Sequence, residues 1–295
     1  MDIKSYMNEM KGLVDKALEE YLPEDAEIPE PLKSSMRYSL FAGGKRLRPA
    51  LAIAASDAAG GRRENALPFA AALEMIHTYT LIHDDLPSLD DDDLRRGKKT
   101  NHKVFGEAMA ILAGDALQTY AFQLMTDRSK VDVPAEIILQ ASHELAVAIG
   151  AEGTVAGQVV DLESEGKSID AETMEYIHAR KTGKLIKASI RGGALLGGSG
   201  GEELEAMAAF GEGIGLAFQI IDDILDIEGT DEALGKDAGS DLEKGKATYP
   251  SIFGIEKSRE IASGLVESSI AKLSLLGERA EPLREIARYF LSRTY

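Results

Sequence analysis

Residues 77–97 read HTYTLIHDDLPSLDDDDLRRG, an apolar segment that runs into six aspartates and then into two arginines. The six carboxylates would repel one another at neutral pH unless cations lay among them, and carboxylate oxygens suit hard ions such as Mg²⁺. Mg²⁺ held by carboxylates usually keeps positions for the phosphate oxygens of a substrate. Arg95 and Arg96, just downstream, are the residue type that grips phosphate. The stretch therefore predicts a site for metal ions and a phosphorylated ligand.

A run of acidic residues is more often only solvated surface, and that alternative has to be weighed. Three features of the sequence argue against it. Pro87 should break or kink the helix where the acids begin. The residues before it are too apolar for a helix that lies free in solvent. A second acidic cluster, Asp222, Asp223 and Asp226, also ends an apolar segment far away in the chain.

The composition of the 295-residue chain excludes several classes of function. Acidic residues number 50 against 33 basic ones, a net charge of -17 that argues against binding to nucleic acid or to anionic membranes. The chain has no cysteine, so disulfides, thiolate metal sites and cysteine nucleophiles are excluded. The N-terminus does not read as a signal peptide, and no uninterrupted apolar stretch approaches the ~20 residues of a membrane helix. We therefore expect a cytoplasmic protein without membrane insertion.

Apolar residues recur at three- and four-residue spacing through most of the chain, whereas alternating runs of strand length are nearly missing. This pattern predicts an all-α fold, a single domain over residues 1–295 with about ten or more helices around a deep central cavity. The expected helices span residues 2–20, 29–41, 46–59, 64–86, 104–126, 133–150, 151–163, 171–190, 202–228, 251–275 and 281–293.

Helical geometry groups the polar residues of each acidic cluster. At about 100° per residue, Gln219, Asp222 and Asp226 lie within about 60° of one another, while Asp223 falls off this stripe.

In the first cluster Asp84 shares a face with His77 and Thr80, but Asp90 would lie about 120° away on a straight helix. Asp84 and Asp90 can hold the same ions only if the chain leaves the helix near Pro87 and folds back.

Basic residues gather in three further places. In GGKRLRP, residues 43–49, Lys45 and Arg48 are three apart and are expected on one face at a helix start, where backbone N–H groups favour an anion. In KTGK, residues 181–184, Gly183 interrupts a helix beside Lys181 and Thr182. Lys236 lies in the polar, glycine-rich segment 229–248, which has the composition of an active-site loop.

These motifs, in this order and over nearly the whole chain, resemble the trans-isoprenyl diphosphate synthases, most closely the bacterial farnesyl diphosphate synthases. The resemblance implies a Mg²⁺-dependent prenyltransferase that acts as a homodimer, with about three Mg²⁺ ions in the substrate-bound state and Mn²⁺ as a substitute. It assigns functional roles to His77, Asp84, Asp90, Arg95, Arg96, Lys181, Thr182, Gln219, Asp222 and Lys236.

The residues and the resemblance indicate the same chemistry. Metal ions held by Asp84, Asp90 and Asp222, together with Arg95, Lys181 and Lys236, would stabilise the diphosphate that leaves dimethylallyl or geranyl diphosphate. A second anion site for isopentenyl diphosphate is predicted from Lys45, Arg48, His77 and Arg96. No side chain stands out as a base for the proton that is lost.

Product length is constrained by the residues one and two turns before Asp84. Thr80 shares the face of Asp84 by geometry, whereas the role of Tyr79 as a floor comes from the resemblance. An aromatic residue at this position, with Pro87-Ser88 inserted between the aspartates, accompanies a fifteen-carbon product in the family. We therefore expect farnesyl diphosphate, with geranylgeranyl diphosphate as the alternative.

Three other functions remain open. A non-catalytic subunit of a prenyl synthase would be expected to have lost aspartates, yet both clusters are complete. A metal phosphohydrolase built on the His83-Asp84 pair would need further histidines upstream, and His77 is too close to serve as a separate element. A terpene cyclase would have no use for the anion site at Lys45 and Arg48.

Overall fold

The computed structural model of the protein describes residues 1–167, 169–228 and 248–292. The all-α prediction is confirmed, because most of these residues are helical and the only strands among them are the pair β1 (Leu94–Arg95) and β2 (Lys98–Lys99). The first helices are α1 (Ile3–Tyr21), α2 (Glu30–Leu40), α3 (Leu47–Ala58), α4 (Arg63–Asp84), α5 (Asn101–Phe105), α6 (Glu107–Met125), α7 (Ala135–Ile149) and α8 (Thr154–Ser164). They are followed by α9 (Ala171–His178), a π-helical turn η1 (Ala179–Gly183), α10 (Lys184–Leu196), α11 (Gly201–Glu228), α14 (Tyr249–Phe253), α15 (Ile255–Lys272), a 3₁₀ segment η2 (Leu273–Ala280) and α16 (Glu281–Leu291).

Most predicted helices appear within a few residues of their expected ends, but three are divided. The helix expected over 104–126 breaks at Gly106 and the one over 251–275 breaks at Gly254, and both glycines have positive φ angles (84° and 80°) that end one helix and start the next. The helix expected over 171–190 is divided into α9, the π-helical turn η1 and α10, and α10 continues to Leu196. The segment 229–247, expected as a loop, lies outside the described residues.

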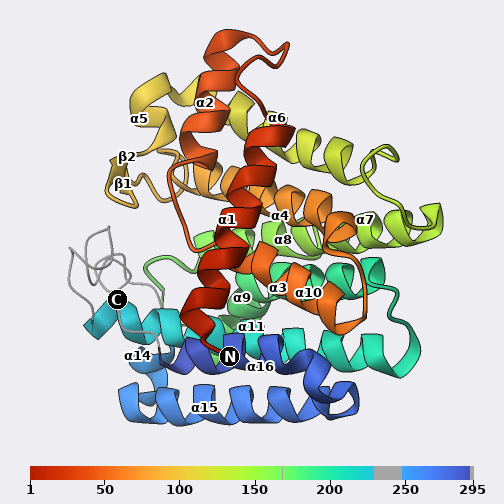
Figure 1. The fold of residues 1–295 in the computed structure, drawn as a ribbon. Helices are drawn as coiled ribbons and strands as arrows, with labels where there is room; N and C mark the ends of the chain where they lie inside the picture. Colours follow the sequence, from red (N-terminus) through yellow and green to blue (C-terminus); the bar gives the residue numbers. More distant parts are fainter. Residues whose placement is uncertain (168, 229–247, 293–295) are drawn as a thin grey trace.

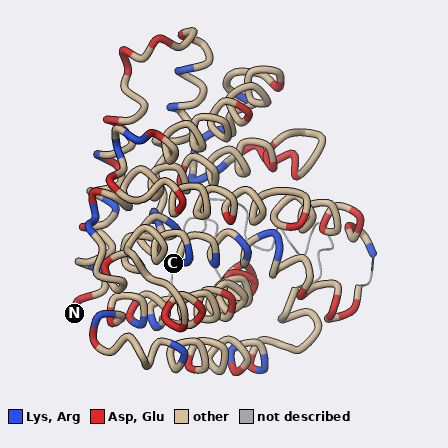
Figure 2. The backbone as a smooth tube through the Cα atoms, turned by 90° about the vertical axis from the view of Figure 1, so that its right-hand side faces the viewer, with Lys and Arg blue, Asp and Glu red and all other residues tan. Residues whose placement is uncertain are grey.

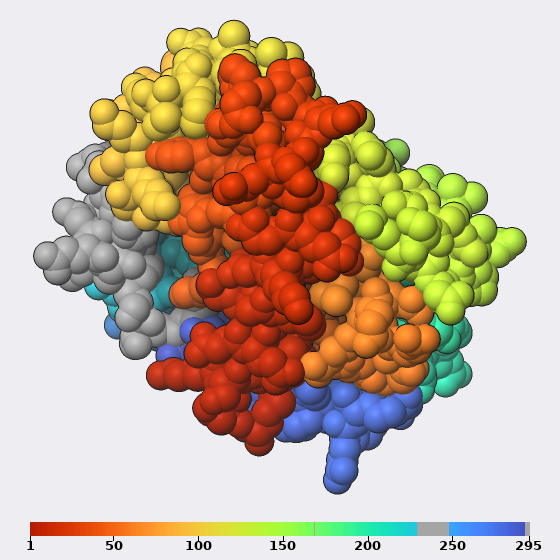
Figure 3. Space-filling view, turned by 45° about the horizontal axis from the view of Figure 1, so that its top comes forward, coloured from red at the N-terminus to blue at the C-terminus, as the bar shows by residue number. Residues whose placement is uncertain are grey.

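The helices stack in successive layers (Figure 1). Helix α4 packs on α6 and α3, α3 packs on α10, α10 packs on α11, and α11 packs on α15. Helix α1 crosses these layers and contacts α3, α4 and α16, so the N-terminal part of the chain ties the layers together. Figure 3 shows α1 and α2 as one continuous band across this face of the molecule.

The interior helices are apolar along almost their whole length. Nine of the twelve residues of α3 are buried, and so are thirteen of the twenty-two residues of α4. Acidic and basic residues lie along most of the helices instead of on one face of the molecule (Figure 2). The large negative charge is therefore spread over the surface.

Two segments are long and apolar enough to span a membrane by length and composition, 135–164 and Gly201–Glu228. The second is α11, half of whose 28 residues are buried in the protein core, and core helices meet the same criterion. The first is divided between α7 and α8 and is largely unburied. The expected lack of membrane insertion therefore stays a prediction.

Helices α3 and α10 cross so closely that their contact needs a glycine. A Cβ atom built on Gly193 of α10 would lie 2.1 Å from the carbonyl oxygen of Ala52 in α3. Because that neighbour is backbone, the clash could be relieved only by moving one helix away from the other.

We predict that Gly193→Ala lowers the free energy of unfolding by about 1–3 kcal/mol, because it forces α3 and α10 apart. The matched control is Gly12→Ala in α1, where an added Cβ would meet nothing within 4 Å. At Gly12 the exchange should be neutral or stabilising by up to about 1 kcal/mol, because alanine is the better helix former. Urea unfolding followed by circular dichroism measures both. Equal effects of the two substitutions would contradict this account of the crossing.

Candidate active site

Three of the cavities in the structure share helices in their walls. The largest, of about 440 Å³, is lined from the loop before α3, from α4 and from Phe218 of α11. A second, of about 230 Å³, lies between α4 and α8. A third, of about 120 Å³, is bounded by α8, α9, η1 and α11. Helix α4 thus walls the first two cavities and α8 walls the last two, so ligands in them would be held by common elements.

The chain folds back after α4, as the pairing of Asp84 with Asp90 requires. Helix α4 ends at Asp84, and the backbone N–H of Asp90 donates to the carbonyl oxygen of Asp84 at 2.8 Å. A tight turn at Pro87 and Ser88 closes this loop, and Asp91 adopts a positive φ of 48°. Asp84 and Asp90, which a straight helix would separate, are therefore neighbours at the end of α4.

Arg95 closes the acidic loop from its other side. Its Nε donates to Asp85 at 2.6 Å and its Nη2 donates to Asp92 at 3.0 Å. Asp85 is buried, and burial raises the pKa of its carboxyl to about 7 against the lowering effect of Arg95. Arg95 thus orders the loop that carries the aspartates, in addition to lying where a phosphate could reach it.

The cationic residues expected to bind a second diphosphate do come together. Lys45, Arg48, His77 and Arg96 all line the cavity of about 440 Å³. The prediction that Lys45 and Arg48 share one face of a helix is wrong, because α3 begins only at Leu47 and Lys45 lies in the loop before it. They converge through the shape of that loop.

His77 is held as a neutral imidazole in this cavity. Burial lowers its pKa well below the ordinary value, and the positive charges of Arg48 and Arg96 lower it further. A neutral ring can donate one hydrogen bond to a diphosphate oxygen without adding charge.

Arg96 and Gly44 lie against each other at the edge of the cavity. Arg96 donates to the carbonyl oxygen of Gly43, and a Cβ on Gly44 would lie 2.8 Å from the Arg96 guanidinium. Gly44 also has a φ of 121°, which side chains rarely allow. The glycine pair in GGKRLRP therefore lets this loop approach Arg96.

The π-helical turn η1 presents Lys181 and Thr182 at the irregularity that the sequence indicated. Two glycines on neighbouring helices make room for it: a Cβ on Gly157 of α8 would lie 2.4 Å from the backbone nitrogen of Lys181, and one on Gly215 of α11 would lie 2.9 Å from the Cα of Gly183. The Nζ of Lys181 donates to Asp161 of α8 at 2.6 Å.

A chain of hydrogen bonds joins this turn to the second acidic cluster. Thr182 donates to Gln219 at 2.9 Å, Gln219 donates to Asp223 at 3.1 Å, and the other carboxylate oxygen of Asp223 accepts the backbone N–H of Tyr249 at 3.0 Å. His178 lies against the same carboxylate, with its Nε2 at 3.7 Å.

The sequence missed Asp223, because helical geometry placed it off the stripe that carries Asp222. Its burial, with 2% of its surface exposed, shows that it serves the interior network instead. Asp161, Glu74 and His178 were missed as well, since each is a single polar residue within a helical pattern and only the fold brings it to the site. Lys236 lies outside the described residues.

Tyr79 and Thr80 line the cavity between α4 and α8 together with Asp84. The Tyr79 ring packs edge-to-face on His83, with centroids 5.8 Å apart. His83 is fixed in turn by Gly114 of α6 and by the carbonyl oxygen of Ile111, 3.1 Å from its Nε2. Across the cavity Val155 and Val159 of α8 supply apolar walls. The space below Asp84 is thus suited to a hydrocarbon chain.

The donor set fits a hard divalent cation. Asp84, Asp90 and Asp222 offer only carboxylate oxygens and are partly exposed. In the parts of the chain that the structure describes, no three acidic or histidine side chains converge closely enough to hold a metal ion by themselves. A hard cation such as Mg²⁺ usually fills its other positions with water or with the phosphate oxygens of a bound substrate.

Comparison with known proteins identifies relatives along nearly the whole chain. The family model for polyprenyl synthetase matches residues 29–275. A farnesyl diphosphate synthase of Geobacillus stearothermophilus is 50% identical over 91% of this chain and 90% of its own. A geranylgeranyl diphosphate synthase of Cyanophora paradoxa is 46% identical over 99% of this chain and 97% of its own. The solved structure of a FPP/GFPP synthase of Zymomonas mobilis superimposes with a TM-score of 0.87, at 38% identity over 98% and 99% of the two chains.

We predict that Gly157→Ala displaces the π-helical turn and weakens the site, because the new Cβ would meet the backbone of Lys181. A shift of this size can cost about 100-fold in turnover. Gly264→Ala in α15, where an added Cβ meets nothing within 4 Å, should leave activity unchanged. The measurement is steady-state release of diphosphate by both variants. Wild-type turnover in Gly157→Ala would show that the close contact does not position Lys181.

Proposed function

Because this chain belongs to the polyprenyl synthetase family and is a trans-prenyltransferase acting on prenyl diphosphates with the help of a divalent metal, we propose that its main product is farnesyl diphosphate. It would form this fifteen-carbon product by two condensations with isopentenyl diphosphate, the first on dimethylallyl diphosphate and the second on geranyl diphosphate. We propose Mg²⁺ as the metal, since every expected ligand is a carboxylate.

We place the allylic diphosphate between the two acidic clusters. When bound, Mg²⁺ would neutralise the negative charge that develops on the departing diphosphate. Asp84, Asp90 and Asp222 would hold the ions, and Arg95 and Lys181 would add positive charge on either side. The carbon–oxygen bond to the diphosphate breaks, and both electrons leave with the diphosphate.

We place isopentenyl diphosphate in the neighbouring cavity, because Lys45, Arg48 and Arg96 offer positive charge there and His77 offers a neutral donor. Its double bond attacks the allylic carbon, forming the new carbon–carbon bond, and a proton then leaves. The released diphosphate is the acceptor we propose for this proton, because it is the strongest base left in the site.

The observation that carries the fifteen-carbon assignment is the place of Tyr79. Its buried ring lines the cavity below Asp84, in the direction in which a growing chain must extend. Packing on His83 limits the rotation of the ring, so it can act as a floor. The relatives include both farnesyl and geranylgeranyl diphosphate synthases at similar identity, which makes the twenty-carbon product the second candidate.

We predict that the wild-type protein converts geranyl and isopentenyl diphosphates mainly to the fifteen-carbon product and that Tyr79→Ala shifts it to products of twenty or more carbons. The conservative control, Tyr79→Phe, keeps the ring and should keep the wild-type product. Chromatography of the dephosphorylated alcohols measures all three. A twenty-carbon alcohol from the wild type, or an unchanged pattern in Tyr79→Ala, would refute the role of Tyr79. Release of no diphosphate at all would favour a non-catalytic subunit.

We also propose that two copies associate through α6, α7 and α8. These helices contact one another in succession and carry half of the large apolar side chains that the described residues leave exposed, seven of fourteen. The exposed residues are Ile111 and Leu112 on α6, Leu139 and Val147 on α7, and Val155, Val159 and Leu162 on α8. A face of this kind is typical of an interface between subunits, and its α8 residues also line the cavity for the hydrocarbon chain.

We predict a sedimentation mass near twice 31.7 kDa at micromolar concentration. Leu112→Glu, at a side chain 54% exposed on α6, should shift the protein toward the monomer because it places a charge in the interface. Leu275→Glu, at a side chain 48% exposed in η2, is the matched control and should not. A monomeric wild type, or equal behaviour of the two variants, would exclude this interface. Binding of the wild type to anionic lipid vesicles would indicate a membrane-facing surface instead.

A further inference from the structure

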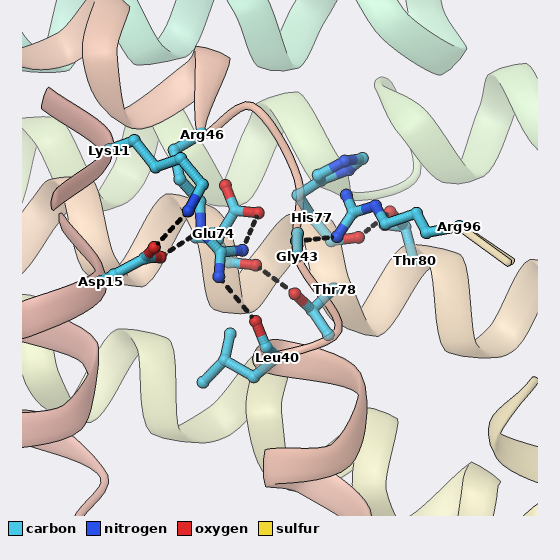
Figure 4. A network of polar contacts seen from close by, with 10 residues as sticks. All are labelled: Lys11, Asp15, Leu40, Gly43, Arg46, Glu74, His77, Thr78, Thr80 and Arg96. Atoms are coloured by element: carbon cyan, nitrogen blue, oxygen red, sulfur yellow. Dashed lines mark hydrogen bonds and ion pairs between the residues drawn. The ribbon is translucent and has the colours of Figure 1, made fainter. Parts of the chain in front are cut away.

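Arg46 follows Lys45 in the loop before α3, here called the cationic loop (residues 43–46). Figure 4 shows its guanidinium directed toward Asp15, Glu74 and the carbonyl oxygen of Leu40. Only 3% of its surface is exposed. Its Nε donates to Asp15 of α1 at 2.7 Å, its Nη1 to Glu74 of α4 at 2.7 Å, and its Nη2 to the carbonyl oxygen of Leu40 in α2 at 2.9 Å. One guanidinium therefore joins three helices to the loop that carries Lys45 and Arg48.

The backbone of Arg46 has an unusual conformation that these contacts hold in place. Its φ and ψ angles are 51° and 39°, in the left-handed region that residues with a Cβ rarely adopt. Such a residue persists only where the surrounding structure over-determines it. The reversal at Arg46 is what sends Lys45 and Arg48 from either side of it into one cavity.

Glu74 places a negative charge next to the guanidinium of Arg46. Its carboxylate is 2% exposed, yet it lines the cavity in which Lys45, Arg48 and Arg96 are expected to bind a diphosphate. An uncompensated carboxylate there would repel the substrate and attract the cations that should bind it. Glu74 also lies one helical turn before His77, so it cannot move away while α4 stays in place.

Arg46 supplies the compensation. Burial by itself would lower the pKa of Arg46, but Glu74 and Asp15 raise it above its ordinary value, so the guanidinium stays charged. Lys11 balances the second carboxylate, with its Nζ 2.8 Å from Asp15. The network thus contains two cations and two carboxylates, and its net charge is zero.

We propose that Arg46 is a positioning residue of the isopentenyl diphosphate site, which fixes the loop bearing Lys45 and Arg48 and cancels the charge of Glu74 beside the substrate. This inference rests on the proposed function, since it assigns that substrate to the cavity. The proposal predicts that Arg46 affects the binding of isopentenyl diphosphate and not that of the allylic substrate. The reason is that Arg46 lines this cavity and not the cavity at Asp84.

The test compares Arg46→Gln, Glu74→Gln and the double variant. Arg46→Gln leaves Glu74 as an unpaired buried charge, so the KM for isopentenyl diphosphate should rise by about tenfold or more. At saturating isopentenyl diphosphate, kcat and the KM for geranyl diphosphate should stay within about twofold of wild type. Adding Glu74→Gln should restore a large part of the lost affinity. A purely structural role of Arg46 would predict no such rescue, because the second substitution removes a further contact.

Arg63→Gln is the matched control. Arg63 also joins three helices, donating to Asp57 of α3 and to Glu9 of α1 from the start of α4, but it lies outside the cavity. The Arg63→Gln variant should have a lower melting temperature but unchanged KM values for isopentenyl diphosphate and for geranyl diphosphate. Arg46→Lys, which keeps the charge but cannot make the three-way contact, should fall between wild type and Arg46→Gln.

Several outcomes would overturn the inference. These are an unchanged KM in Arg46→Gln, a parallel rise in both substrates' KM values, or a double variant no better than Arg46→Gln. If Arg46→Gln does not fold, Arg46→Lys and the double variant decide in the same way. The affinity of each variant for isopentenyl diphosphate is also measured by calorimetry. A wild type that binds isopentenyl diphosphate but forms no product would refute the proposed function. The role of Arg46 would then still be judged from the measured affinities.

Discussion

The site depends on the packing of helix α4 between α3 and α6. Because small residues let these helices approach closely, α4 cannot rotate or slide, and its few polar side chains are held at fixed angles. Glu74 and His77 face the cationic cavity, while Tyr79 and Asp84 face the cavity toward α8. One rigid helix therefore sets the spacing between the two cavities, and in the function proposed above it would set the spacing between the two substrates that form a bond.

A second constraint is the balance of charge inside a low-dielectric interior. Arg46 with Glu74 and Arg95 with Asp85 are paired where an isolated charge would be costly. Lys45 and Arg48 line a cavity that solvent or an anion can enter. A local group of cations of this kind allows a protein with a net negative charge to bind an anion.

Irregular backbone marks the functional stretches. Among the described residues, those other than glycine with positive φ are Arg46 in the loop before α3, Asp91 in the acidic loop and Arg96 in the turn between β1 and β2. The π-helical turn at Lys181 is a fourth irregularity. Each carries a conformational cost that regular helix would avoid, and each is held by contacts from neighbouring elements. The regular bundle thus supports the few places where the chain must deviate to present side chains.

The sequence by itself determined the helical class, most helix positions, the two acidic clusters and the cations at Lys45, Arg48 and Lys181, because periodicity and charge are local properties. It also set a condition, that the chain must fold back at Pro87, which the backbone hydrogen bond between Asp90 and Asp84 meets. Only the tertiary structure decided which single polar residues belong to the site. Glu74, Asp161 and Asp223 look like ordinary helical residues in the sequence, and their partners Arg46, Lys181 and Tyr249 lie 20 to 28 positions away along the chain. Pairing at such separations depends on how helices cross, and the pattern within one helix does not contain that information.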